Sequence, residues 1–164
     1  MRGRLILLTF LLLTGVALTG CGKRVGPLPP AITENITLFY GDEGNEKMVT
    51  EQRQISFNPE DDKYKLALIE LIKGPNNQNY MANIDPKTIV YGTIRQDTSL
   101  IVDFSEEFNR FNGTMAEIIG IGSVVNTLTT FEEIKKVKIL VEGEDLIAPS
   151  GSPRGFMGPF STKP

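Results

Sequence analysis

The first 21 residues constrain the chain more than any other segment, because they determine which part of it folds and in which compartment. Two arginines precede an apolar run at residues 5–18, and two small residues separate this run from Cys21, the only cysteine in the protein. A charged start, a short apolar stretch and a small-residue junction are the parts of a secretory signal. The sequence therefore predicts that residues 1–20 are removed on export and that the remainder folds without an internal disulfide.

The junction at Cys21 carries a second signal. An aliphatic residue, Leu18, stands three positions before Cys21, with Thr19 and Gly20 between them. This order resembles the lipobox of bacterial lipoproteins. The resemblance implies a diacylglycerol thioether on Cys21, cleavage before that residue, and a chain held by lipid at the extracytoplasmic face of the cell membrane.

Two other interpretations of this segment fit the sequence less well. A membrane-spanning helix is disfavoured, since about 14 apolar-rich residues are too few where about 20 are needed. An ordinary secretory signal would leave Cys21 as a free thiol, which is a liability in an oxidising compartment. Position, flanking residues and cysteine count all favour the lipid anchor.

Composition restricts the chemistry of the mature chain. The formal charge is −3, and loss of Arg2 and Arg4 with the signal takes it to −5, so we expect no nucleic-acid partner. The sequence contains no histidine, which excludes a Ser-His-Asp triad and a histidine metal site. With Cys21 carrying lipid, thiolate catalysis and thiolate zinc sites are excluded as well. The composition favours a binding module over an enzyme, and we expect no cofactor and no metal.

The sequence divides the mature chain into a tether, one domain and a tail. Residues 21–34 are the lipidated cysteine and a tether, residues 35–145 are one domain, and residues 146–164 are a Pro/Gly-rich tail that we expect to be disordered. Within the domain, alternation predicts strands at 36–40, 48–57, 88–95, 99–104 and 137–142, and helical spacing predicts helices at 58–75 and from residue 114 onward.

Both helices have sequence signals at their ends. Asn58 followed by Pro59 predicts the start of the first helix, and the residues at 73–75, Lys-Gly-Pro, predict its end. Thr114 and Glu117 have the spacing of a capping box for the second helix. The residues expected to face the core are Tyr64, Ala67, Leu68, Leu71 and Ile72 in the first helix, and Met115, Ile118, Ile119, Gly122, Val125 and Leu128 in the second.

The resulting element order is ββαββαβ. It predicts an α+β fold in two layers, with two helices packed on one face of a mixed, mostly antiparallel sheet. The other face of that sheet must then be polar or be covered by a partner.

Several segments taken together resemble one family. They are the opening strand Ile36–Tyr40, the helix end Leu68–Pro75, Ile84–Thr88, the strand and turn Leu100–Phe108, the segment Val124–Phe131 and the closing strand Val137–Gly143. In order and spacing, residues 34–144 are similar to the GerM-type (GerMN) domain of sporulation and spore-germination lipoproteins. The Gly-Pro after the helix, the Val-Asp-Phe-Ser-Glu-Glu-Phe segment and the Thr-Leu-Thr segment carry most of the resemblance.

The resemblance implies an extracytoplasmic, membrane-anchored interaction domain in a Gram-positive-type envelope. It also implies kinship with ring-building domains that oligomerise in sporulation secretion complexes. The chain has length for one such domain. The expected partners are the membrane, through the N-terminal lipid, and envelope proteins or further copies of the chain, with peptidoglycan as a further candidate.

Three groups of side chains are candidate sites, and each also has a simpler structural explanation. Asp103, Glu106 and Glu107 could act as acid and base on a cell-wall glycan, but acids after Ser105 also suit a capped helical turn. The acidic residues at 42–46 could donate oxygens to calcium, but they lack the distal bidentate glutamate and fit a hairpin turn.

The third group lies in the amide-rich loop at residues 76–83. Tyr80 and Met81 in this loop are candidates for contact with a partner or a glycan, because exposed loops often carry binding residues. An exposed loop of this length is also often simply mobile.

The favoured hypothesis is a non-enzymatic lipoprotein whose domain binds envelope proteins or itself, in sporulation or spore germination. The alternative is a cell-wall (peptidoglycan) processing enzyme, or its accessory subunit, that uses surface carboxylates. Solute capture is disfavoured, because a domain of roughly 110 residues rarely encloses a two-lobed cleft.

Overall fold

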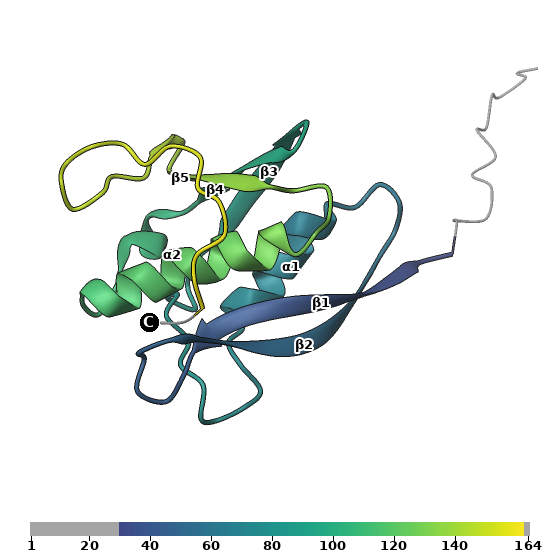
Figure 1. Ribbon diagram of the computed structural model, residues 1–164. Coiled ribbons are helices and arrows are strands. Elements are labelled where there is room, and N and C mark those ends of the chain that lie inside the picture. Colours follow the sequence, from purple (N-terminus) through teal and green to yellow (C-terminus); the bar gives the residue numbers. More distant parts are fainter. Residues whose placement is uncertain (1–29, 163–164) are drawn as a thin grey trace, which may run out of the picture.

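The computed structural model describes residues 30–162, in which two helices lie between a two-stranded hairpin and a four-stranded sheet (Figure 1). The elements are β1 (Ile32–Gly41), β2 (Met48–Phe57), α1 (Lys63–Ile72), β3 (Val90–Gln96), β4 (Ser99–Phe104), the 3-10 helix η1 (Glu106–Asn109), α2 (Thr114–Thr129), β5 (Lys136–Val141) and β6 (Glu144–Asp145). The predicted α+β fold and the order ββαββαβ are confirmed, with β6 as a short addition. The expectation of a single sheet is wrong.

The hairpin pairs β1 with β2 along their whole length, from Ile32 opposite Phe57 to Gly41 opposite Met48. β1 begins at Ile32, so residues 32–34, which were expected in the tether, belong to the first strand. The tether before the domain is therefore shorter than the sequence suggested.

The hairpin stays separate from the larger sheet because other groups occupy the outer edge of β1. The backbone N–H of Phe39 donates to Oγ1 of Thr127 in α2 at 3.2 Å. The backbone N–H of Gly41 donates to the carbonyl of Met81 at 3.0 Å. A further strand on this edge would need the same backbone groups, so the helix and the 76–83 loop exclude it.

The four-stranded sheet has the order β3-β4-β5-β6, and only its β4–β5 pair is parallel. A parallel pair needs a long crossover, which η1 and α2 provide. Leu100, Val102 and Phe104 of β4 are fully buried. They form the centre of the core together with Val137 and Ile139 of β5.

The first helix starts later than the sequence predicted. Its N-cap is Asp62, whose carboxylate accepts the backbone N–H of Lys65 at 3.0 Å. Asn58 instead opens a turn, in which its carbonyl accepts the N–H of Asp61 at 2.9 Å. The predicted end is confirmed, with Gly74 in the left-handed region at φ 86°. The predicted core stripe is buried at Ala67, Leu68, Leu71 and Ile72 and partly buried at Tyr64.

The second helix starts at Thr114 as predicted, but its first turn differs from expectation. Gly113 is the N-cap without a side-chain cap, and Glu117 forms an ion pair with Arg154 at 3.0 Å instead of closing a capping box. Met115 and Ile118, which were expected in the core, are exposed. Residues 119–128 are all buried, because both β layers cover this part of the helix.

Residues 146–162 were expected to be a disordered tail, and they instead pack against the domain. Met157 exchanges two backbone hydrogen bonds with Val137 of β5, both at 2.8 Å. Phe160 donates its N–H to Oδ1 of Asn126 at 2.7 Å and accepts from Nδ2 of the same side chain at 3.1 Å. A buried amide on α2 therefore fixes a segment that its composition marks as unstructured.

No helix within residues 30–162 combines the length and the apolar character needed to cross a membrane. The predicted signal and the lipobox residues Leu18, Thr19, Gly20 and Cys21 lie outside the described residues.

Gly120 of α2 lies too close to neighbouring residues for a larger side chain. We therefore expect Gly120→Ala to destabilise the domain by about 1–3 kcal/mol. A Cβ atom there would lie 2.6 Å from Cε1 of Phe111 and 3.0 Å from the carbonyl oxygen of Asn83. The gain in helix propensity, about 1 kcal/mol, offsets only part of that strain. Urea unfolding measures the difference.

Gly122→Ala is the matched control in the same helix. Its Cβ would lie 3.1 Å from the flexible end of Met48, which can move aside. We expect this variant to stay within about 1 kcal/mol of the wild type. Equal stability of the two variants would contradict the assignment of Gly120 to a close contact.

Candidate functional site

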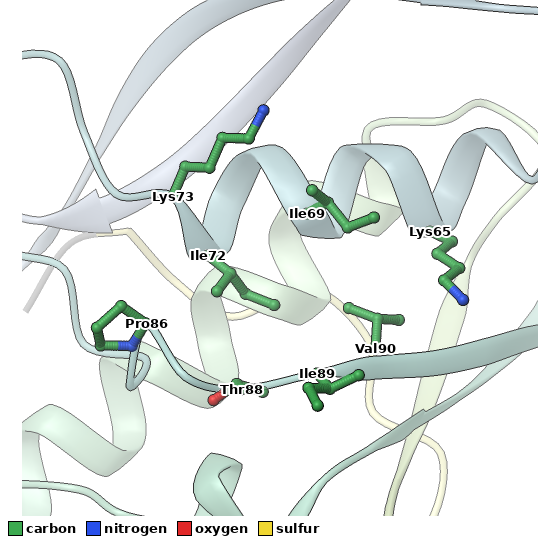
Figure 2. Close-up of a pocket in the computed structure, with 8 residues that line it drawn as sticks. All are labelled: Lys65, Ile69, Ile72, Lys73, Pro86, Thr88, Ile89 and Val90. Atoms are coloured by element: carbon green, nitrogen blue, oxygen red, sulfur yellow. The ribbon is translucent and has the colours of Figure 1, made fainter.

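A groove of about 430 Å³ opens between α1 and the segment that leads into β3 (Figure 2). One wall is α1 and the other is the segment at residues 86–90. The lining residues are Lys65, Ile69, Ile72, Lys73, Pro86, Thr88, Ile89 and Val90. An apolar hollow with a few polar groups is the usual composition of a binding site.

Hydrogen bonds hold the 86–90 wall on both sides of Thr88. The N–H of Thr88 donates to the carbonyl of Asp85 at 2.9 Å, and the N–H of Lys87 donates to the Asp85 carboxylate at 2.8 Å. Ile89 donates its N–H to Oγ of Ser105 and accepts the N–H of Ser105, both at 2.9 Å. A wall fixed in this way needs little ordering when a partner binds.

Two isoleucines give the groove its exposed apolar surface. Ile69 of α1 is 36% exposed and Ile89 is 57% exposed, whereas Ile72 and Val90 are buried beneath them. Large apolar side chains gathered at a hollow mark an interaction surface more strongly than the same side chains scattered singly.

The polar groups of the groove are one hydroxyl and two ammonium groups. Thr88 is only 6% exposed, and its Oγ1 has no hydrogen-bond partner among the described residues. An unsatisfied buried hydroxyl costs about 1–3 kcal/mol. Lys65 donates to the carbonyl of Tyr91 at 3.0 Å, and Lys73 pairs with Glu70.

The carboxylates singled out in the sequence make structural contacts. Asp103 accepts a backbone N–H from the β5–β6 turn at 3.0 Å, and Arg110 pairs with Glu106 and Glu107, both at 3.3 Å. The predicted helical turn after Ser105 is present as η1, but the expected cap is wrong. The Ser105 side chain makes no cap hydrogen bond, and its Oγ accepts the N–H of Ile89 instead. A hydrogen bond with Ser105 lowers the pKa of Glu107, which is the opposite of what a general acid at neutral pH needs.

The other two predicted groups lie apart from the groove. Asp42 accepts the N–H of Glu46 at 2.8 Å, and this bond lowers the pKa of the Asp42 carboxyl. Tyr80 is partly buried against the core. Met81 is exposed beside a second, more polar hollow that Arg110 also lines. A role for Tyr80 and Met81 in partner contact stays a prediction.

The groove itself cannot be identified from the sequence pattern alone. One signal was available: Ile69 lies off the buried stripe of α1, on a face where a polar residue is normal. Ile89 carried no comparable signal, because an isoleucine in an expected strand is ordinary. Only the packing of α1 beside the 86–90 segment brings these two side chains to one hollow.

The model of the Germane family, described as sporulation and spore germination, matches residues 37–147. The chain belongs to this family. The match extends from β1 to the residues just after β6, and it confirms the resemblance to the GerM-type domain. Membership places this Germane protein among proteins of sporulation and spore germination.

Solved structures share the fold of this Germane domain. The tandem GerMN domains of the sporulation protein GerM from Bacillus subtilis superpose with a TM-score of 0.63 at 20% identity, over 80% of this chain and 47% of that one. The first GerMN domain of that protein gives 0.56 at 24% identity, over 79% and 96% of the two chains. A candidate lipoprotein from Clostridium perfringens gives 0.51 at 19% identity, over 75% and 87%. No curated protein matches the sequence.

The chain thus spans about half the length of the tandem GerM structure and nearly all of a single GerMN domain. At identities of 19–24%, these structures support a shared fold and nothing further.

The second prediction concerns the unpaired hydroxyl. We expect Thr88→Val to stabilise the ligand-free protein by about 1 kcal/mol, because valine has the same shape and no group to leave unsatisfied. Thr127→Val is the control, since the Thr127 hydroxyl accepts the N–H of Phe39 and its loss should destabilise. Thermal unfolding measures the stability of each variant relative to the wild type. A destabilised Thr88→Val variant would show that its hydroxyl is already satisfied.

Proposed function

We propose that this Germane protein is an extracytoplasmic lipoprotein that acts by binding another envelope protein through the groove beside α1, in sporulation or spore germination. The observation that supports it most is the groove itself, with a wall held by hydrogen bonds and two exposed isoleucines. Binding is favoured over catalysis because the lining residues of the groove include no carboxylate, thiol or imidazole.

The charges around the groove define the chemistry of the partner. Lys65 and Lys73 lie on its α1 wall, and Lys87 lies on the segment opposite. Complementary charge steers association and sets specificity. The occupant we propose is a short aliphatic segment of an envelope protein, flanked by Asp or Glu residues.

The lipid anchor keeps this groove near the membrane. Ten residues, 22–31, separate Cys21 from the start of β1, and an extended chain of that length reaches at most about 36 Å. A binding domain tethered within that distance meets membrane partners at a high effective concentration.

Photo-crosslinking in intact cells tests the groove. A photo-reactive residue in place of Ile89 should capture a protein partner, and the capture should fall at least tenfold when Ile69→Ser is added. The same residue in place of Ile94, which is 61% exposed on β3 outside the groove, is the control. Equal capture from both positions, or capture of wall glycan alone, would overturn the proposal.

The anchor has its own test. We expect Cys21→Ser to move the protein from the membrane pellet to the soluble extracytoplasmic fraction, because the serine hydroxyl cannot form the thioether. Fractionation followed by mass spectrometry of the N-terminus provides the measurement. A variant that stays with the membrane and carries no acyl chain would refute lipid attachment at Cys21.

A further inference from the structure

The strand β2 has one edge that faces away from β1. In an antiparallel pair, residues alternate between those that exchange hydrogen bonds with the partner strand and those whose N–H and C=O point away from it. Gly41 directs its backbone groups to Met81, at 3.0 and 2.8 Å, so Gly41 and its β2 partner Met48 are of the second kind. The same alternation turns outward the backbone groups of Met48, Thr50, Gln52, Gln54 and Ser56.

These outward groups lack several of the usual protections of an edge strand. Among residues 30–162 no hydrogen bond to them is found. β2 contains no proline and no lysine, and its ten residues pair with β1 without a bulge. Natural proteins protect a long edge with such devices or with charged residues, since a bare edge pairs with other strands. The charged residues of β2 are Glu51 and Arg53, which neutralise each other as an ion pair. β1 differs, because α2 and Met81 occupy part of its own edge.

We propose that β2 pairs antiparallel with β2 of a second copy of this chain, about a two-fold axis at Gln52, so that two hairpins form one four-stranded sheet. The inference goes beyond the groove, because none of the residues that line the groove belongs to β2. A two-fold contact uses the same surface on both copies and closes on itself, so it gives a dimer and not a filament.

The charges of β2 select this register. Glu51 and Arg53 are its only charged residues. With Gln52 opposite Gln52 of the second copy, Glu51 of each copy lies opposite Arg53 of the other. In any other register of this pairing, outward-facing residues must still lie opposite outward-facing residues. The nearest such registers are therefore shifted by two residues. Such a slide places Glu51 opposite Glu51, or Arg53 opposite Arg53, and like charges directly opposite one another are destabilising.

Glu51 and Arg53 already form an ion pair with each other on the same face of β2. Arg53 Nη1 also donates to the carbonyl of Glu70 at 2.8 Å and Nη2 to the carbonyl of Gly74 at 3.1 Å, so its guanidinium is fixed in place. In the proposed register the pairs of the two copies lie side by side with opposite charges facing each other, which is the favourable cross-strand arrangement.

Disulfide crosslinking of the full chain in cells tests the pairing and its register. In the proposed dimer, the two Gln52 Cα atoms lie about 5.5 Å apart, within the range that a disulfide spans. Gln52→Cys should therefore give a covalent homodimer under mild oxidation. Gln54→Cys is the matched control on the same face of the same strand, since its two copies lie about 13 Å apart in this register. The wild-type chain, whose only cysteine is Cys21, measures any crosslinking that arises from that residue.

A second variant tests whether the disulfide forms because the strands pair or because two chains collide at random. Thr50→Pro removes an outward N–H that β1 does not use, so the hairpin can tolerate it. Added to Gln52→Cys, it should lower the crosslinked yield at least tenfold, while circular dichroism shows the fold unchanged. Equal yields from Gln52→Cys and Gln54→Cys, an unchanged yield with Thr50→Pro in a folded protein, or an adduct with a different protein would each overturn the proposal.

Discussion

The burial of α2 on every side is the constraint on which the rest of the structure depends. Residues 119–128 of this helix are all buried, between the hairpin, the four-stranded sheet, α1 and the C-terminal segment. Two buried polar side chains on it have specific partners. Thr127 accepts the N–H of Phe39 in β1, and Asn126 holds the backbone of Phe160 in the C-terminal segment. Because buried polar groups need partners, these two residues determine which segments pack on the helix.

The position of α2 also explains where the molecule can bind. As the crossover between two parallel strands it covers one face of the sheet. The hairpin packs on the other side of the helix and stays two-stranded, which leaves β2 with a bare edge. α1 packs beside β3, and the groove remains between α1 and residues 86–90. Both surfaces are consequences of the same layered packing.

Ionic contacts then connect the layers at their periphery. Lys63 at the start of α1 lies 2.8 Å from Glu133 in the loop before β5, and the Tyr64 hydroxyl donates to the same carboxylate at 2.8 Å. The hydrogen bond from Lys63 lowers the pKa of Glu133 to about 2. This carboxylate therefore stays ionised at any physiological pH, and it links α1 to the segment that follows α2.

The sequence by itself determined the elements whose signals are local. Alternation identified the strand β4, helical spacing identified the core stripe of α1, and Lys73-Gly74-Pro75 identified its end, because each depends only on neighbouring residues. Order and spacing of these elements also identified the family. The tertiary structure decided what these elements contact. It separated the hairpin from the sheet, exposed Met115 and Ile118, and ordered residues 146–162 on the domain. It also formed the groove, because Ile69 and Ile89 are brought together by packing between segments twenty residues apart, which no local pattern encodes.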